Sequence, residues 1–331
     1  MRISVVCPVY NTPPNLLRAA TQSVIDVAGS HLHELILVDD VSTDVETIEA
    51  VKQIALGDRR IVVVRSPRNV GQSSARNLGI HTATGDWIGF LDHDDLWLPG
   101  RTELAVAVIE EFPDAKWIAG NFAKLYGDGS RESALTISAV RPGSRLSDCL
   151  VRFEKPDLTR RLLRNGWFHL GASLIWKELL ESIGGFYDGF YFQEDYIFFA
   201  RISVVADLFF IERDFYLWRR DIDSLWTSPA RLTEVYAAGW RRTRDDALLR
   251  PFRRDLRWTL YGTYKGLALN NLLNGFRGRG FYFAFRALML DPRELGEVLL
   301  FLRLMMRRDN RKLPEAELRY SSAERFIVRP R

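Results

Sequence analysis

Residues 87–95 read WIGFLDHDD, an apolar run that leads directly into three carboxylates. The run has the length of a strand, and Leu104, Val108 and Ile109 follow it at helical spacing. We therefore predict a buried strand that carries the acids at its carboxyl end. In open α/β sheets ligands bind at that end of the strands, so the stretch predicts an α/β fold with a binding site beside Asp92.

The three acids favour a metal site. Side chains alternate along an extended backbone, so we expect Asp92 and Asp94 to point to the same side and to share one divalent cation. Mg²⁺ and Mn²⁺ prefer oxygen ligands and keep coordination positions for water and for nucleotide phosphates. An isolated D-x-D-D is as often an ordinary turn or a helix cap; the strand in front of it is what favours metal binding.

Length and composition limit the possible number of domains and the possible location of the protein. The 331 residues, 47% of them hydrophobic, are enough for one large domain and an appendage. Cys7 and Cys149 lie far apart and have no metal-ligand spacing, which predicts a reduced, cytoplasmic location. Strand-like sequence begins at Ile3, and no apolar run approaches the roughly 20 residues that span a bilayer. We therefore expect neither a signal peptide nor a transmembrane segment.

The first hundred residues alternate predicted strands with predicted helices. The expected strands are residues 3–8, 35–38, 61–64 and 87–91. These runs lack polar alternation, which indicates strands buried on both faces of a doubly wound, mostly parallel sheet flanked by helices. Crossovers in such sheets are right-handed, so we expect the strand ends with Tyr10, Asp40 and Asp92 to meet at one rim.

Charge is distributed unevenly along the chain. Residues 230–331 hold 22 Lys and Arg against 11 Asp and Glu, a net charge of +11, which leaves −7 for residues 1–229. An acidic N-terminal part suits a cation-dependent site, and a basic tail suits an anionic partner such as a membrane surface. Nucleic acid is the competing partner of the tail. No nucleic-acid-binding module is recognisable, so we expect no nucleic acid.

The basic tail is predicted to be helical. Residues 291–294 (DPRE) have the pattern of a helix start, and apolar residues follow at helical spacing. Phe281, Phe283 and Phe285 lie just before this start, among arginines. An apolar stripe of this kind over residues 277–312 suits a helix on an anionic membrane surface. It equally suits packing on the catalytic domain or on a second copy in a homo-oligomer, and these alternatives stay open.

Six short motifs together resemble the GT-A glycosyltransferases of family two, which transfer a sugar from a nucleotide sugar with inversion. The resemblance covers residues 1–225, and the order and spacing of the motifs carry it, because each is weak alone. The motifs are Val6–Asn11, Leu37–Asp44, Asn69–Gly71 with Ala75–Ile80, Gly85–Trp87 with Phe90–Asp95, Gly184–Phe186, and Glu194–Asp195.

The resemblance implies a GT-A catalytic domain over residues 1–227, followed by a basic helical C-terminal extension over residues 228–331. Within the catalytic domain, residues 1–100 would bind the nucleotide sugar and residues 101–227 the acceptor. It also implies a UDP-sugar donor and, as acceptor, a glycan or lipid-linked saccharide of bacterial surface polysaccharide synthesis. The expected location is cytoplasmic, at the inner face of the inner membrane.

The resemblance also assigns roles to single residues. Asp195 matches the base that takes the acceptor proton, and Glu194 is the reserve candidate for that role. Asp92 and Asp94 match the metal-binding motif, with Mn²⁺ or Mg²⁺ as cofactor, and Asp221 takes the place of a histidine that often approaches the metal. The donor-binding residues are Pro8, Tyr10, Asn11, Asp40, Arg76, Asp92 and Arg219.

Some assignments have competing interpretations. Arg76 is either a donor contact or a solvated helix residue, and His169 is expected to be structural. The family usually has glycine in place of Val41, so the turn after Asp40 is expected to differ. For the whole chain the alternatives are a noncatalytic nucleotide-sugar or glycan-binding protein and a sugar-phosphate nucleotidyltransferase. The second lacks support, because residues 8–11 stand where its glycine-rich loop would be.

Overall fold

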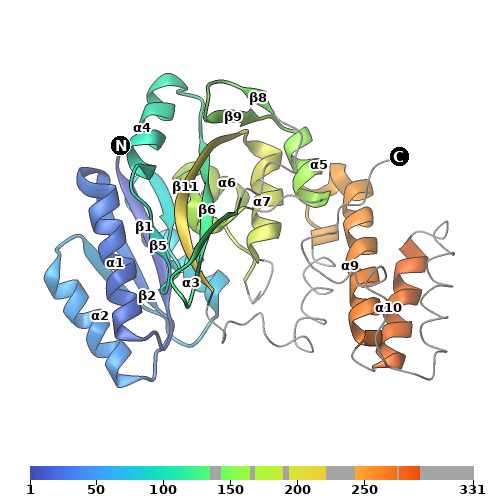
Figure 1. The fold of residues 1–331 in the computed structure, drawn as a ribbon, viewed down its shortest axis with the longest axis horizontal. Helices are drawn as coiled ribbons and strands as arrows, with labels where there is room; N and C mark the ends of the chain where they lie inside the picture. Colours follow the sequence, from blue (N-terminus) through green and yellow to red (C-terminus); the bar gives the residue numbers. More distant parts are fainter. Residues whose placement is uncertain (135–142, 165–167, 189–193, 221–242, 274–275, 291–331) are drawn as a thin grey trace. The chain divides into compact units, whose positions relative to one another are not determined.

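The computed structural model describes residues 1–134, 143–164, 168–188, 194–220, 243–273 and 276–290 (Figure 1). Asp221 and the helix start predicted at residues 291–294 lie outside the described residues. Contacts within the chain divide it into two compact units, Met1–Leu162 with Gly166–Ser228, and Leu163–Asn165 with Pro229–Arg331.

The first unit is built on one sheet, whose main strands follow the order β3-β2-β1-β4-β10-β6-β11-β9-β8. Strands β3, β2, β1 and β4 are parallel, β10 is antiparallel to both neighbours, and β6 and β11 are again parallel. The prediction of a mostly parallel wound sheet is therefore confirmed. The strands are β1 Ile3–Val9, β2 Leu32–Asp39, β3 Ile61–Arg65, β4 Trp87–Phe90, β5 Leu96–Trp97, β6 Trp117–Tyr126, β7 Arg131–Ala134, β8 Ser144–Arg145, β9 Leu150–Phe153, β10 Ser173–Trp176 and β11 Leu208–Arg220.

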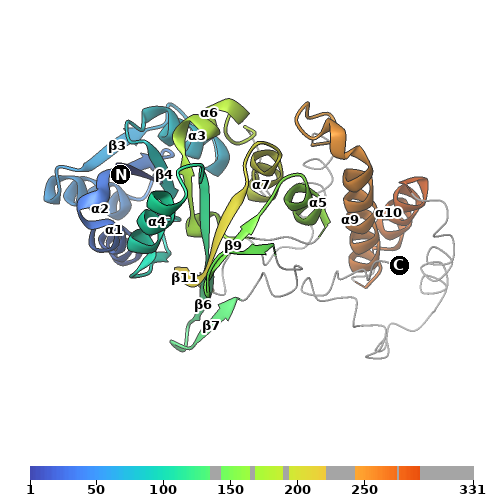
Figure 2. The same ribbon diagram turned by 90° about the horizontal axis from the view of Figure 1, so that it is seen from above.

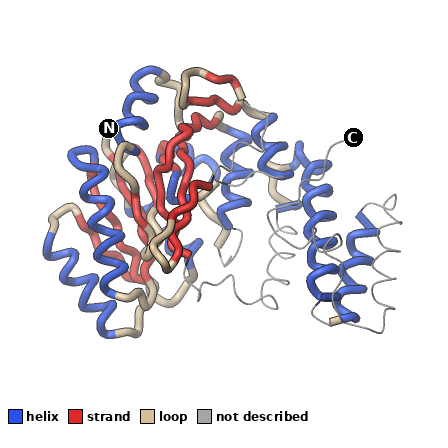
Figure 3. Tube along the Cα trace, in the orientation of Figure 1, coloured by secondary structure: helices blue, strands red, loops and turns tan. Residues whose placement is uncertain are grey.

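Helices cover both faces of this sheet (Figures 2 and 3). One face carries α1 (Pro14–Ala28), α2 (Val45–Gly57) and α4 (Arg101–Glu111), and the other carries α3 (Gln72–Thr82), α6 (Lys177–Ile183) and α7 (Glu194–Val205); α5 is Asp157–Arg164. Both faces of β1 are covered, which explains why all its residues except Ser4 are apolar. Val5 and Cys7 belong to the same core cluster as Leu17 of α1, whereas Val6 faces α3, where a Cβ on Gly79 would lie 2.3 Å from its Cγ1.

The predicted rim forms where the parallel strands end. Val9 is in register with Asp39, and Val6 is in register with Phe90, so β1, β2 and β4 end at the same edge of the sheet. The residues that follow these strands, among them Tyr10, Asp40 and Asp92, therefore gather at that edge, as predicted.

The second unit consists, in its described part, of a short 3₁₀ turn, Arg250–Phe252, and two helices, α9 (Arg253–Leu273) and α10 (Arg277–Leu290). The two helices pack side by side, with Tyr264 of α9 stacked on Phe283 of α10 at 6.1 Å between ring centroids. The two helices approach closely at Gly280, where a Cβ would lie 2.6 Å from Cγ of Leu272 and 3.2 Å from the carbonyl oxygen of Ala268. None of the described helices combines the length and the apolar character needed to cross a membrane.

Candidate active site

Asp40 lies at the end of β2 and is held by the loop that precedes α3. Its two carboxylate oxygens accept the backbone N–H groups of Val70 and Gly71, each at 2.8 Å. A carboxylate oxygen has two lone-pair directions, so each oxygen can accept one further donor. Tyr10 stands nearby on the rim with 47% of its surface exposed. The pair can therefore offer an acceptor and an aromatic face to a ligand.

Asn11 joins the loop after β1 to the loop after β2. Its Oδ1 accepts the backbone N–H groups of Thr43 at 2.8 Å and Asp44 at 3.0 Å. Val41, in the second loop, has φ of 64°, the left-handed region that favours glycine. A β-branched residue is strained there, by about 1–3 kcal/mol. The turn thus keeps a conformation suited to glycine, although the sequence has valine.

The acidic cluster lies on a turn and not on an extended strand. Strand β4 ends at Phe90, and the N–H of Asp95 donates to the carbonyl of Asp92 at 3.1 Å. Our reason for placing Asp92 and Asp94 on one side, the alternation of an extended backbone, is therefore wrong. Tyr216 of β11 holds the turn instead: its hydroxyl accepts the N–H of Asp92 at 3.0 Å and is hydrogen-bonded to the carboxylate of Asp95.

The acids of this turn repel one another. Burial raises the pKa of Asp95 well above its usual range, and the charges of Asp94 and Asp92 raise it further. Burial is the largest single effect and acts to raise the pKa of Asp92, but the charge and the hydrogen bond of Arg76, together with other nearby groups, outweigh it and the pKa is lowered. A divalent cation would relieve the repulsion, and an all-oxygen donor set is what Mg²⁺ and Mn²⁺ prefer. The residues present therefore fit such an ion.

His169 lies beside the acids but is poorly suited to bind the cation. One ligand atom from each of Asp92, Asp95 and His169 lies within 4.8 Å of the others. The Nδ1 of His169 accepts the N–H of Gly171 at 3.2 Å, and burial lowers the pKa of the ring to about 4. The neutral ring must then carry its proton on Nε2, which leaves that nitrogen no lone pair for a metal. The ring instead stacks on Tyr216 at 4.4 Å, in line with the expected structural role.

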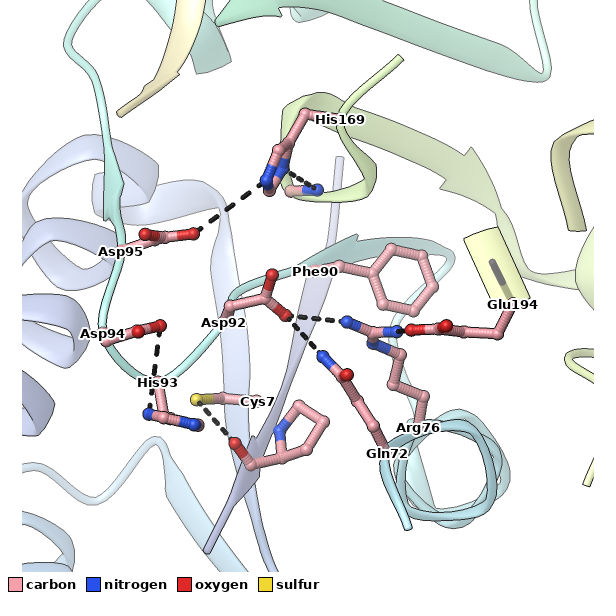
Figure 4. A network of polar contacts seen from close by, with 12 residues as sticks. Cys7, Gln72, Arg76, Phe90, Asp92, His93, Asp94, Asp95, His169 and Glu194 are labelled. Carbon is pink, nitrogen blue, oxygen red and sulfur yellow. Dashed lines mark hydrogen bonds and ion pairs between the residues drawn. The ribbon is translucent and has the colours of Figure 1, made fainter. Parts of the chain in front are cut away.

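Arg76 is not a solvated helix residue. Its side chain is buried, and its Nη2 donates to Asp92 at 2.7 Å while its Nη1 donates to Glu194 at 2.9 Å (Figure 4). Gln72, one turn earlier on α3, also donates to Asp92, at 3.2 Å. Although burial lowers the pKa of Arg76, the two carboxylates raise it above the usual value. Arg76 thus ties the acidic turn to the start of α7.

Asp195 occupies the first turn of α7, next to Glu194. The pKa of Asp195 is raised to about 7, first by burial and then by the charge of Glu194, against the opposing effect of Arg76. A carboxylate that only stabilises a helix N-terminus would be expected to have a lowered pKa. A pKa near neutrality is what a general base requires, so the electrostatics favour the catalytic interpretation.

Pro8 and Arg219 are two further predicted site residues that the structure describes. Pro8 lies buried within β1. The backbone N–H of Arg219 donates to Asp95 at 2.8 Å, and its Nε is buried without a hydrogen-bond partner within the described part of the chain. Three site residues were missed: Tyr216, Gln72 and, as a separate member of the site, Asp95. Tyr216 follows an ordinary strand pattern, so the sequence around it contains no signal of its role.

Several known proteins resemble this chain in sequence. A model of the family described as glycosyl transferase family 2 matches residues 4–169. The uncharacterized protein y4gI of Sinorhizobium fredii is 34% identical over 280 residues, which cover 79% of this chain and 28% of that protein. The succinoglycan biosynthesis protein ExoW of Rhizobium meliloti is 31% identical over 191 residues, covering 55% of this chain and 57% of ExoW. The chain thus spans less than two thirds of the length of either relative.

Solved structures show the same fold. The crystal structure of residues 1–349 of TarS from S. aureus in complex with UDP-GlcNAc superposes with a TM-score of 0.61, over 92% of this chain and 90% of that chain, at 16% sequence identity. The same protein in complex with UDP gives a TM-score of 0.60 at 18% identity. At this level of identity the likeness concerns the fold alone.

Proposed function

Because this chain belongs to glycosyl transferase family 2, we propose that it transfers a sugar, with inversion, from a nucleotide-diphosphate sugar to a hydroxyl group of an acceptor. The proposal rests on the position of Asp195. This half-buried carboxylate, with a pKa of about 7, lies in the first turn of α7, and Arg76 links that helix to the acidic turn. A proton acceptor and a cluster suited to bind a diphosphate-bound cation are thereby parts of one network.

The donor is proposed to be a UDP-sugar. Asp40 can accept the N–H of a uracil base, and Tyr10 is exposed where a ring can pack on the base. The TarS complexes with UDP and UDP-GlcNAc support this choice. We propose that Asn11 and Pro8 shape this pocket, and that Arg219 contacts the diphosphate, since Arg forms forked, charge-assisted pairs with phosphate.

Asp92 and Asp94 are the proposed holders of a divalent cation, Mn²⁺ or Mg²⁺, with Asp221 as a further candidate. When bound, such a cation stabilises the negative charge of the departing diphosphate. Arg76 keeps Asp92 ionised and therefore able to bind the cation. At the diphosphate end of the donor, the protein's own residues would orient the diphosphate and hold the carboxylates that bind the cation.

At the other end of the donor, Asp195 is proposed to accept a proton. As the acceptor oxygen forms its bond to the anomeric carbon, the O–H bond of the acceptor breaks and its proton passes to the Asp195 carboxylate. The bond from the anomeric carbon to the diphosphate oxygen breaks at the same time, and the electron pair leaves with the nucleoside diphosphate. Attack from the side opposite the leaving group inverts the configuration.

A thermal-shift panel tests the donor site. We expect UDP with Mn²⁺ to raise the melting temperature more than UDP alone, and more than GDP or ADP with Mn²⁺, because a ligand stabilises the state that it binds. At a ligand concentration 100 times the dissociation constant, binding raises the free energy of unfolding by about 2.7 kcal/mol. Equal shifts for all three nucleotides, or none, would contradict a uridine-specific donor site.

The acceptor is proposed to be a glycan or a lipid-linked saccharide of a bacterial surface polysaccharide, and the similarity to the succinoglycan biosynthesis protein supports this class.

We propose that residues 1–227 form the catalytic domain and residues 228–331 a C-terminal extension. Within the catalytic domain, residues 1–100 would bind the donor and residues 101–227 the acceptor. In this scheme the extension brings the enzyme to the cytoplasmic face of a membrane that holds the acceptor.

Helix α10 provides the surface for that contact. Its buried side, with Phe283, Ala284 and Ala287, packs in the second unit, while its other side is exposed and apolar. Residues 276–290 contain three arginines and no acidic residue. An apolar face with basic neighbours fits an anionic lipid surface. The exposed apolar residues are Phe276, Phe281, Tyr282, Phe285 and Met289.

Vesicle binding tests this surface. We expect the protein to sediment with phosphatidylglycerol vesicles and not with phosphatidylcholine vesicles, and less so at high salt. Replacing Phe281 and Phe285 together by Ser should weaken binding at least about tenfold, because each buried Phe contributes about 1.5–3 kcal/mol. Leu56→Ser, which changes an exposed apolar residue on α2, is the matched control. A concentration-dependent dimer without vesicle binding would instead assign the face to a second copy of the chain.

A further inference from the structure

The side chain of Asn77, on α3, pairs with the backbone of Phe186 in both directions. Its Nδ2 donates to the carbonyl of Phe186 at 2.9 Å, and its Oδ1 accepts the N–H of the same residue at 2.8 Å. The amide thereby satisfies both polar groups of one residue, as a neighbouring strand would. Nδ2 also donates to Asp188 at 3.0 Å. Asn77 thus fastens the loop after α6 to α3.

The glycine before Phe186 is shaped for this contact. Gly185 has φ of 64°, in the left-handed region, and a Cβ at this position would lie 2.5 Å from Oδ1 of Asn77. A residue with a side chain would therefore be strained there and would displace the amide. The Gly-Gly-Phe motif and the Asn after Arg76 thus fit one another, although they are more than one hundred positions apart.

The same loop is packed against α7. The ring of Phe186 stacks on Phe198 at 4.1 Å between centroids, with an angle of 9° between the planes. Arg201, one turn further along α7, donates to the carbonyl of Gly185 at 2.5 Å and to that of Ile183. Any shift of the loop relative to α3 would therefore shift α7 as well.

Helix α3 makes further contacts with this loop and with the start of α7. Ser74 donates to Asp188 at 2.9 Å, and Arg76 donates to Glu194, the first residue of α7, at 2.9 Å. Two successive side chains of α3, Arg76 and Asn77, thus hold α7 at its first residue and at the loop that packs on it. Because Arg76 also binds Asp92, this helix sets the position of α7 relative to the acidic turn.

We propose that Asn77 is a positioning residue for Asp195: by fixing the loop after α6 to α3, it sets the distance between the proton acceptor and the donor-binding rim. The proposal rests on the proposed function of Asp195. Asn77 itself touches neither the acidic turn nor Asp40 through any contact within the described residues, so its loss should leave nucleotide binding intact and impair turnover.

The test is Asn77→Ala, assayed in three ways. We expect turnover of a UDP-sugar panel to fall about 100-fold, the effect of a misplacement of about 1 Å in an active site. The affinity for UDP with Mn²⁺ should stay within about twofold. Hydrogen exchange should speed up at residues 186–188 and in the first turn of α7. Wild-type turnover, or unchanged exchange in these segments, would overturn the proposal.

A pair of exchanged side chains guards against a variant that merely folds poorly. Asn77→Asp keeps the acceptor for Phe186 but places a second carboxylate beside Asp188, so turnover should fall as in the alanine variant. Adding Asp188→Asn restores the donor–acceptor contact between positions 77 and 188 but not the donor to the carbonyl of Phe186, so turnover should recover only in part, about threefold. Full recovery to the wild-type rate would contradict the proposal, because it would show that the bond to the Phe186 carbonyl is not needed. His81→Ala, an exposed change on the same helix, is the control and should keep wild-type turnover.

Hydrogen exchange separates this proposal from the proposed function. If the wild-type protein turns over none of the UDP-sugars, the proposed function fails. Faster exchange in the first turn of α7 in Asn77→Ala would still show that Asn77 fixes that helix, and unchanged exchange would still refute it. If the wild-type protein is active and Asn77→Ala loses UDP affinity as strongly as turnover, Asn77 belongs to the donor site and not to the positioning of Asp195.

Discussion

Replacing Asp195 by Asn is expected to lower sugar transfer by about 10²–10⁴-fold, the usual contribution of a general base. The amide keeps the size of the side chain but cannot accept the proton of the acceptor hydroxyl. Binding of UDP with Mn²⁺ should change little, because the donor-binding groups lie at the other end of the network. A protein that only binds nucleotide sugars or glycans would have no turnover to lose, so this variant separates an enzyme from a binding module.

The pH dependence of the rate provides the control for Asp195. A base must be ionised to accept a proton, and the pKa of Asp195 is raised to about 7 by burial and by the charge of Glu194. We therefore expect the rate to rise with pH through about 7 and to level off above it. Glu194→Gln removes a negative neighbour and frees Arg76 from that partner, and both changes favour ionised Asp195, so the midpoint should move to lower pH. An unchanged midpoint in that variant would contradict the assignment of the base.

The rim of the sheet is predictable from the sequence because the signals for it are local. Apolar runs mark β1, β2 and β4, and the polar residues that follow them lie at the strand ends by necessity. Tyr10, Asp40 and Asp92 can therefore be assigned to one edge from the sequence alone. The signal for the start of α3, which spans Gln72–Thr82, is also local, because a glycine precedes the helix and small residues occupy its first turn.

Contacts between distant parts of the chain cannot be predicted in this way. Tyr216, which holds the acidic turn, is 124 positions from Asp92, and Glu194 is 118 positions from Arg76. The pattern around Arg76 allows either a donor contact or a solvated side chain, and neither interpretation anticipates burial between two carboxylates. The alternation argument for Asp94 fails for a related reason: it assumes that β4 continues, but strand ends depend on tertiary pairing.

Loss of a bound cation is also expected to slow sugar transfer strongly. We expect Asp94→Asn to lower sugar transfer about 10³-fold, because several kcal/mol of stabilisation of the leaving diphosphate depend on a bound divalent ion, and each 1.36 kcal/mol is tenfold in rate. The added melting-temperature shift that Mn²⁺ gives in the presence of UDP should disappear in this variant. Asp26→Asn, on the exposed side of α1, is the matched control and should behave as wild type.

Asp94 is a more informative position for this test than its neighbours. Asp92 is bound to Arg76 and Gln72, so its replacement would disturb the link to α7 together with the ion. Asp95 is buried and hydrogen-bonded to Tyr216 and the backbone of Arg219, so its loss would unsettle β11. Asp94 is partly exposed, with the ring of His93 at 3.9 Å, so its replacement should disturb the surrounding fold less than the replacement of buried Asp95 would. If Asp94→Asn keeps its turnover and its Mn²⁺-dependent melting-temperature shift with UDP, Asp94 is not a metal ligand. If EDTA leaves the wild-type rate unchanged, transfer depends on the charged side chains around the diphosphate and not on a cation.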